Sequence, residues 1–158
     1  MDGLERGGGL TLRERRKGRE TALQTLYQLD ITNDGAEASL AAFAESFESA
    51  PGAEEFTLML VHGVVRRRAE IDEIVSAAIE NWRFERLSRV DLNVLRIAVY
   101  ELTTPPVLPP EIAINEAVEI ARRFGTAESA AFVNGVLDQV ATRLGLKTRA
   151  EPKPAEPE

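Results

Sequence analysis

Apolar side chains recur every three to four residues along most of the chain, which is the spacing of an amphipathic helix. This pattern predicts a first helix over residues 12–31, which ends at the turn-forming cluster of residues 32–35. A short Ala-rich helix is expected near residues 37–47. The stretch from 53 to 80 keeps helical spacing and is predicted to form two helices, with a bend at residues 66–68.

The next helix is expected to lie at the centre of the fold. Ser88 and Asp91 stand as S-x-x-D, which is a typical N-cap signal, and the helix that follows them is apolar almost all round. Its narrow polar strip consists of Arg89, Asn93, Arg96 and Tyr100. A helix that is apolar on most of its circumference is normally surrounded by other helices.

Prolines mark the start of the last two helices. The pairs at 105–106 and 109–110 exclude helix from the connecting loop, and Pro110 suits the first turn of a helix that ends at Gly125. The final helix is expected to begin near residues 126–128 and to bury a stripe from Phe132 to Leu144. With six to seven helices and no convincing strand, the fold class is predicted to be all-α.

Composition limits the class of protein further. Hydrophobic residues make up 44% of the 158 residues, and there are no cysteines, so a disulfide framework, a thiolate nucleophile and a zinc cluster are not expected. No apolar run is long enough to span a membrane, and the N-terminus does not resemble a secretory signal. We therefore expect a cytoplasmic protein with a Gly-rich disordered leader (1–11), a folded domain (12–146) and a disordered, acidic, Pro-rich tail (147–158).

Catalysis is not expected. The only histidine, His62, stands among apolar residues of a periodic helix and is interpreted as a structural, tucked-in side chain. Common motifs for phosphate, metal or nucleophile chemistry are absent, and the carboxylates share helical faces with arginines, as in solvated ion pairs. The sequence therefore predicts no catalytic residue, no metal site and no cofactor.

The strongest candidate for function is a basic run at the start of the first helix. The net charge is −7, yet residues 13–19 hold five basic side chains against one acid. One helical face begins with Arg15, Arg16 and Arg19 and continues with Ala22, Leu23 and Leu26. Since an unpaired buried charge is costly, we expect this helix to leave the core partway along, so that its arginines extend past the packed body.

An anionic partner is one explanation of this run. Arg15, Arg16, Lys17 and Arg19 cover more than half of the helix circumference, which suits a phosphate backbone, and Gly18 removes a side chain where a strand could approach. Cations at a helix start also oppose the helix dipole, which a bound anion would relieve. The alternative is a solvated, frayed helix start.

Polar and aromatic residues near the run could contact bases. Gln24 and Tyr27 border the apolar stripe one to three turns downstream, where they could meet splayed single-stranded bases. Phe132 is interpreted first as a core residue and second as a stacking platform. Asn134 lies at the edge of the last stripe, and Gly135 lies opposite the core, either as an ordinary exposed glycine or as a site of close approach by another chain.

Three segments together resemble a known family. RRKGRETALQTLYQ, NWRFERLSRVDLNVLRIAVYEL and EIAINEAVEIARRFGTAESAAFVNGVLDQV are similar in order and spacing to the bacterial NusB family of transcription antitermination proteins. The resemblance covers residues 13–144. It implies two packed small helical bundles, which we place at about 12–80 and 81–146. It also implies binding of boxA RNA in nascent ribosomal RNA transcripts, jointly with the ribosomal protein NusE, and assembly with other Nus factors on RNA polymerase.

The resemblance also implies site residues. The predicted RNA-binding residues are Arg15, Arg16, Lys17, Arg19, Gln24, Tyr27, Phe132 and Asn134. The resemblance does not locate the docking site of NusE, which we predict at the start and along the polar strip of the central helix, at Arg89, Asp91, Asn93 and Arg96. The family's compact arginine run is interrupted here by Lys17 and Gly18, and the leader and tail match no part of the family pattern.

Two alternatives to RNA binding stay open at this point. One is a helical protein–protein adaptor whose arginines meet an acidic partner. The other is a homodimer that covers the basic run. Under the RNA-binding hypothesis, changing Arg15 and Arg19 to alanine together is expected to weaken RNA binding and flatten its salt dependence without affecting folding.

Overall fold

The chain folds into helices throughout the described part of a computed structural model, residues 9–32, 53–79 and 84–146. The elements are α1 (Leu12–Thr32), α3 (Ala53–Arg66), α4 (Arg68–Ala78), the short 3-10 helix η1 (Phe84–Arg86), α5 (Arg89–Thr103), α6 (Pro110–Phe124) and α7 (Ser129–Arg143). No strand occurs in these ranges, so the all-α prediction is confirmed. The helix predicted near 37–47, most of the leader and the tail lie outside the described residues.

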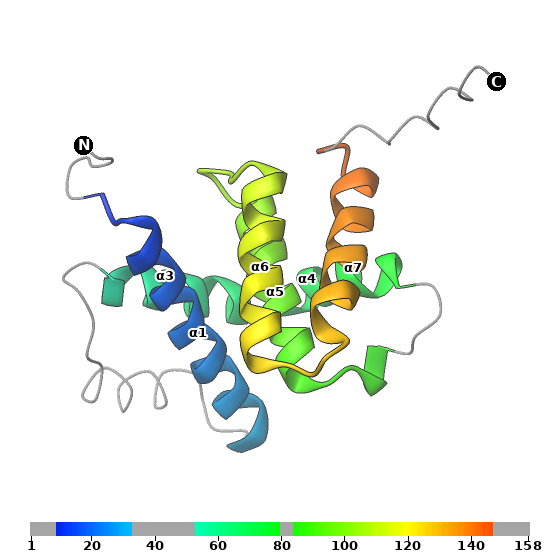
Figure 1. Ribbon diagram of the computed structural model, residues 1–158, viewed down its shortest axis with the longest axis horizontal. Coiled ribbons are helices and arrows are strands. Elements are labelled where there is room, and N and C mark those ends of the chain that lie inside the picture. The colour runs from blue at the N-terminus through cyan, green and yellow to red at the C-terminus, as the bar shows by residue number, and fades with distance from the viewer. Residues whose placement is uncertain (1–8, 33–52, 80–83, 147–158) are drawn as a thin grey trace.

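Helix α5 is the centre of the fold, as predicted. It packs against α1, α3, α4, α6 and α7, and every residue from Leu92 to Leu102 is buried. Figure 1 shows α1 on one side of α6 and α7 on the other. The core is one continuous cluster that includes side chains from both halves of the chain.

Local signals in the sequence set the helix ends. Ser88 caps α5, because its hydroxyl oxygen accepts a hydrogen bond from the Asp91 amide at 3.0 Å. The bend expected at residues 66–68 is present, since α3 ends at Arg66 and α4 begins at Arg68. Pro110 opens α6, where the absence of its N–H costs no helical hydrogen bond.

Two glycines allow helices to pack closely. A Cβ on Gly63 of α3 would lie only 2.1 Å from Cε1 of Tyr100 on α5, so the tyrosine ring occupies the space of the missing side chain. A Cβ on Gly18 of α1 would lie 2.7 Å from Cδ2 of Phe56 on α3. The Gly18 carbonyl also accepts a hydrogen bond from the Thr57 hydroxyl at 3.1 Å, which joins the two helices.

Two predictions about individual side chains are wrong. His62 is exposed, because it follows Leu60 by about 200° around α3 and therefore points away from the core that Leu60 and Val64 enter. Leu144 is 39% exposed, since α7 ends at Arg143 and the chain turns away before Leu144 can continue the buried stripe.

Candidate nucleic-acid interface

The first turns of α1 present several cations at the surface. Arg13 and Lys17 are exposed, and Arg15 and Arg16 are half-buried. The guanidinium of Arg15 lies over the Phe56 ring, 5.3 Å from its centroid, so an aromatic side chain of α3 supports it by a cation–π contact. Arg13, Arg15, Arg16 and Lys17 together form the exposed basic surface of α1.

Arg19 does not belong to this surface, and the expectation that it extends past the packed body is wrong. Its side chain is 3% exposed and lies over the Phe56 ring. It donates to both carboxylate oxygens of Glu101 on α5, at 2.7 and 3.0 Å, and reaches Glu116 on α6 at 3.5 Å. Burial is tolerated because this charge is paired with carboxylates of α5 and α6, partners that the pattern along α1 could not reveal.

Arg16 is held by the same group of carboxylates. Its Nε and Nη2 donate to the two oxygens of Glu116 at 2.9 and 2.7 Å, in the two-pronged geometry that suits a guanidinium. These bonds lower the pKa of Glu116 below its ordinary value, against the opposing effect of burial, and they raise the pKa of Arg16. The side chain of Arg16 remains 42% exposed, so part of the guanidinium can still face a ligand.

The role predicted for Gly18 is also wrong. Gly18 is buried against Phe56 and Thr57, so no strand of nucleic acid could approach the backbone there. Its missing side chain instead lets Phe56 come close to α1, where the ring lies beneath the guanidinium groups of Arg15 and Arg19. The glycine therefore supports the basic surface indirectly.

The two polar and aromatic candidates on α1 are accessible. Gln24 is exposed and Tyr27 is 39% exposed. At 100° per residue, Lys17, Gln24 and Tyr27 fall within about 80° of one another on the helix. A ligand that lies along α1 can therefore meet all three.

The candidates on α7 lie farther away. Phe132 is half-buried and packs against the core, while Asn134 is exposed. In Figure 1, α6 separates α7 from α1, so the two groups of candidates form one surface only across α6. Asn134 lines a groove between α6 and α7, together with Glu111, Ile114, Asn115, Val118 and Asp138. The two carboxylates in this groove disfavour a phosphate, so a contact at Asn134 would have to be made to a base or sugar.

Two of the four candidate partner residues on α5 are not at the surface. Asn93 is fully buried and Arg96 is 6% exposed, so the prediction that this strip meets a partner fails for both. Arg96 donates to both oxygens of Asp72 at 2.7 and 2.8 Å, and it also reaches Asp30. These bonds connect α5 to α4 and to the end of α1, which is a structural use of the strip.

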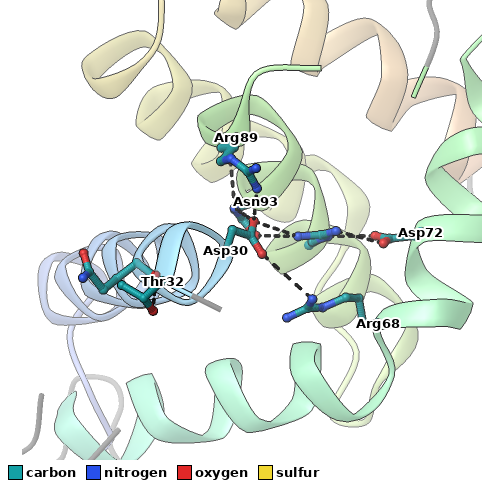
Figure 2. A network of polar contacts seen from close by, with 8 residues as sticks. Asp30, Thr32, Arg68, Asp72, Arg89 and Asn93 are labelled. Carbon is teal, nitrogen blue, oxygen red and sulfur yellow. Dashed lines mark hydrogen bonds and ion pairs between the residues drawn. The ribbon is translucent and has the colours of Figure 1, made fainter. Parts of the chain in front are cut away.

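Asp30 is the centre of this network, as Figure 2 shows. The Asn93 amide donates to its carboxylate at 2.8 Å, and Arg96 does so at 3.2 Å. Arg68 and Arg89 approach the same carboxylate at 3.9 and 3.8 Å. Three helices thus meet at one aspartate whose side chain is 6% exposed.

The other two partner candidates stay accessible. Arg89 keeps 54% of its side chain exposed, and Asp91 is half-buried in the first turn of α5. The Oδ1 atom of Asp91 is buried without a hydrogen-bond partner among the described residues. A docking surface at this end of α5 would therefore rest on Arg89 and Asp91.

Residue types alone did not identify several side chains that shape these surfaces. Phe56, Glu101 and Glu116 position the arginines of α1, and Asp30 joins three helices. Phe56, Glu101 and Glu116 are each separated in the sequence from the arginine that they contact by 37 residues or more. The one available signal was a carboxylate on an otherwise apolar helix face, as at Glu101, because such a group needs a buried cation.

The fold and the exposed basic surface define an all-helical protein that presents cations at one end of its first helix. The sequence profile of the NusB family matches residues 16–142. Transcription antitermination protein NusB of Myxococcus xanthus is 47% identical over 134 residues, which covers 82% of this chain and 96% of that protein. NusB of Anaeromyxobacter dehalogenans is 44% identical over 140 residues, covering 87% and 96% of the two chains. The chain belongs to the NusB family.

Solved structures agree with this assignment. T. maritima NusB superimposes with a TM-score of 0.73 at 36% identity, covering 81% of this chain and 90% of that chain. The structure of antitermination factors NusB and NusE in complex with double-stranded RNA gives a TM-score of 0.74 at 28% identity, covering 84% and 99%. None of the helices in the described ranges is both long enough and apolar enough to cross a membrane.

Proposed function

We propose that this chain is a transcription antitermination factor that binds boxA RNA of nascent ribosomal RNA transcripts together with the ribosomal protein NusE. Its relatives bear the name of transcription antitermination proteins, and one solved relative is a complex of NusB and NusE with RNA. The complex would join other Nus factors on RNA polymerase. The function is one of binding rather than catalysis, and it places the protein in the cytoplasm.

One observation carries the proposal: two of the cations of the exposed basic surface, Arg15 and Arg16, are held in place by buried groups from other helices. Phe56 of α3 supports Arg15, and Glu116 of α6 holds Arg16 while leaving much of it exposed. An arginine that is already positioned loses less side-chain entropy when it meets a phosphate. A merely solvated helix start would not need such support.

We assign different tasks to the predicted RNA-binding residues. Arg15, Arg16 and Lys17 neutralise phosphates, and Gln24 and Tyr27 contact bases farther along α1. Phe132 and Asn134 extend the surface on α7 through stacking and amide contacts. Arg19 contributes by holding α1 against α5 and α6 rather than by touching the RNA.

NusE is proposed to dock at the start of α5. Arg89 and Asp91 are the accessible members of the predicted set and offer both signs of charge to a partner. The Oδ1 atom of Asp91 is itself buried, so the proposed contact rests on the charge of this half-buried side chain rather than on that oxygen.

A titration of single-stranded boxA RNA into the full chain, with and without NusE, tests the proposal. We expect RNA to bind the chain alone and to bind more tightly when NusE is present. A protein–protein adaptor would instead bind NusE with an affinity that RNA does not change. A homodimer that covers the basic surface would show a mass that falls toward the monomer as RNA is added.

A further inference from the structure

An acidic residue interrupts the stripe of α1 that is proposed to face RNA, which consists of Lys17, Gln24 and Tyr27. Lys17, Glu20, Gln24 and Tyr27 fall within about 80° of one another around the helix, so Glu20 stands between a proposed phosphate contact and the proposed base contacts. A free carboxylate at this position would repel the phosphates of any strand that follows the helix. The side chain of Glu20 is nevertheless only 7% exposed, although its neighbours on the stripe are exposed.

Arg123 covers this carboxylate. It stands in the last turn of α6, and its Nη1 donates to both oxygens of Glu20, at 2.9 and 3.2 Å. The side chain of Arg123 is 65% exposed, and its guanidinium lies 5.2 Å from the centroid of the Phe124 ring. One nitrogen is engaged with Glu20, while Nε and Nη2 make no hydrogen bond to the described residues and remain available to a ligand.

The position of Arg123 also matters for the path of the RNA. Glu116 and Arg123 are two turns apart on α6, and both reach α1, at Arg16 and at Glu20. The end of α6 leads directly into α7, which carries Phe132 and Asn134. Because α6 lies between α1 and α7 (Figure 1), the last turn of α6, which carries Arg123, connects the helices of the two groups of proposed RNA contacts.

We infer that Arg123 is a further RNA-binding residue, which masks the charge of Glu20 and continues the basic surface from α1 across the end of α6. This inference rests on the proposed function. Because Arg123 covers the carboxylate of Glu20, the surface at this place presents a guanidinium to a ligand. Removing Arg123 should therefore harm binding in two ways, through loss of a phosphate contact and through exposure of Glu20.

The test compares Arg123→Gln with Arg122→Gln in the full chain, using single-stranded boxA RNA at several salt concentrations. Arg122 is a matched control, because it stands in the same turn with 59% of its side chain exposed but pairs with Glu119 on its own helix. We expect Arg123→Gln to weaken binding about five- to tenfold and to reduce the salt slope by about 0.7. Arg122→Gln should change the affinity less than about twofold.

A second-site change separates masking from a general loss of charge. Adding Glu20→Gln to Arg123→Gln removes the exposed carboxylate, so the double variant should bind RNA more tightly than Arg123→Gln does. The single variant Glu20→Gln is measured as the reference for the effect of the second change by itself. Urea denaturation of each variant shows that binding is measured on folded protein. The inference is overturned if Arg123→Gln binds as the unchanged chain does, if Arg122→Gln loses as much, or if Glu20→Gln recovers nothing. Weaker binding by an Arg15→Ala, Lys17→Ala variant in the same assay would show that the proposed function stands even then.

Discussion

Arg19 of α1 donates to both carboxylate oxygens of Glu101 of α5, and the two side chains are 82 residues apart in the sequence. The pair is buried, with 3% of the arginine and 9% of the glutamate side chain exposed. It fixes the helix that carries the exposed basic surface to the central helix of the fold. The buried pair therefore keeps the cations of the neighbouring turns in place.

The first prediction concerns the stability of this pair. Arg19→Met leaves Glu101 buried without its main partner and is expected to reduce the free energy of unfolding by about 3 kcal/mol in urea titrations. Lys17→Met, two residues away and exposed, should change it by less than about 0.5 kcal/mol. Adding Glu101→Leu to Arg19→Met should recover most of the loss; a double variant as unstable as the single would contradict the account.

The second prediction concerns the exposed basic surface. Arg15→Ala with Lys17→Ala should weaken the binding of boxA RNA and reduce its salt slope by about 1.4, since two phosphate contacts are lost. Because both residues lie outside the buried network, unfolding should change little. This double variant is preferred to the combination of Arg15→Ala with Arg19→Ala. The sequence predicted that folding would be unaffected in that combination, whereas the burial of Arg19 now predicts that it would be impaired. An unchanged salt slope would exclude these side chains from the interface.

The third prediction uses one substitution at two glycines. Gly135→Ala should stabilise the protein by up to about 1 kcal/mol, because the position is in a helix and an added Cβ meets nothing within 4 Å. Gly63→Ala should destabilise it despite the same gain in helix propensity, since the Cβ would lie 2.1 Å from the Tyr100 ring. Thermal unfolding of the two variants should shift in opposite directions, and a shift in the same direction would show that α3 and α5 are not packed in this way.

The fourth prediction is a pH dependence. The pKa of Glu116 in the folded protein is lowered below 4.5 by the hydrogen bonds from Arg16. The unfolded chain therefore binds a proton at Glu116 before the folded chain does. The stabilisation by this carboxylate is complete above pH 4.5 and is lost as the pH falls through the lowered value. Glu116→Gln should lose less stability between pH 5 and pH 3 than the unchanged protein does; equal losses would show that the bonds from Arg16 do not stabilise the charged form.

The sequence predicted the helices well, because their signals are local. Apolar periodicity located α1, α3 and α4, the S-x-x-D motif located the start of α5, and Pro110 located the start of α6. Such signals depend on neighbouring residues, which the sequence shows directly. The near-complete apolar circumference of α5 also placed it correctly at the centre of the fold.

The functional surfaces were harder to predict, since they depend on partners far away in the chain. Periodicity put Arg15, Arg16 and Arg19 on one face but could not show that Glu101 would bury Arg19 while Phe56 supported Arg15 at the surface. In the same way, the polar strip of α5 suggested a docking surface, whereas Asp30 and Asp72 use Arg96 to join three helices. The type of a residue indicated its chemistry, and its distant partner determined whether that chemistry reaches solvent.

The most direct test of the central claim is the affinity of the chain, with NusE present, for boxA RNA compared with a scrambled RNA of the same composition. Both RNAs carry the same phosphates, so the comparison removes the nonspecific electrostatic attraction. We predict tighter binding of boxA RNA, by about tenfold or more, at moderate salt. Equal affinities for the two RNAs, or no binding of either, would contradict the assignment of this chain as a boxA-binding antitermination factor.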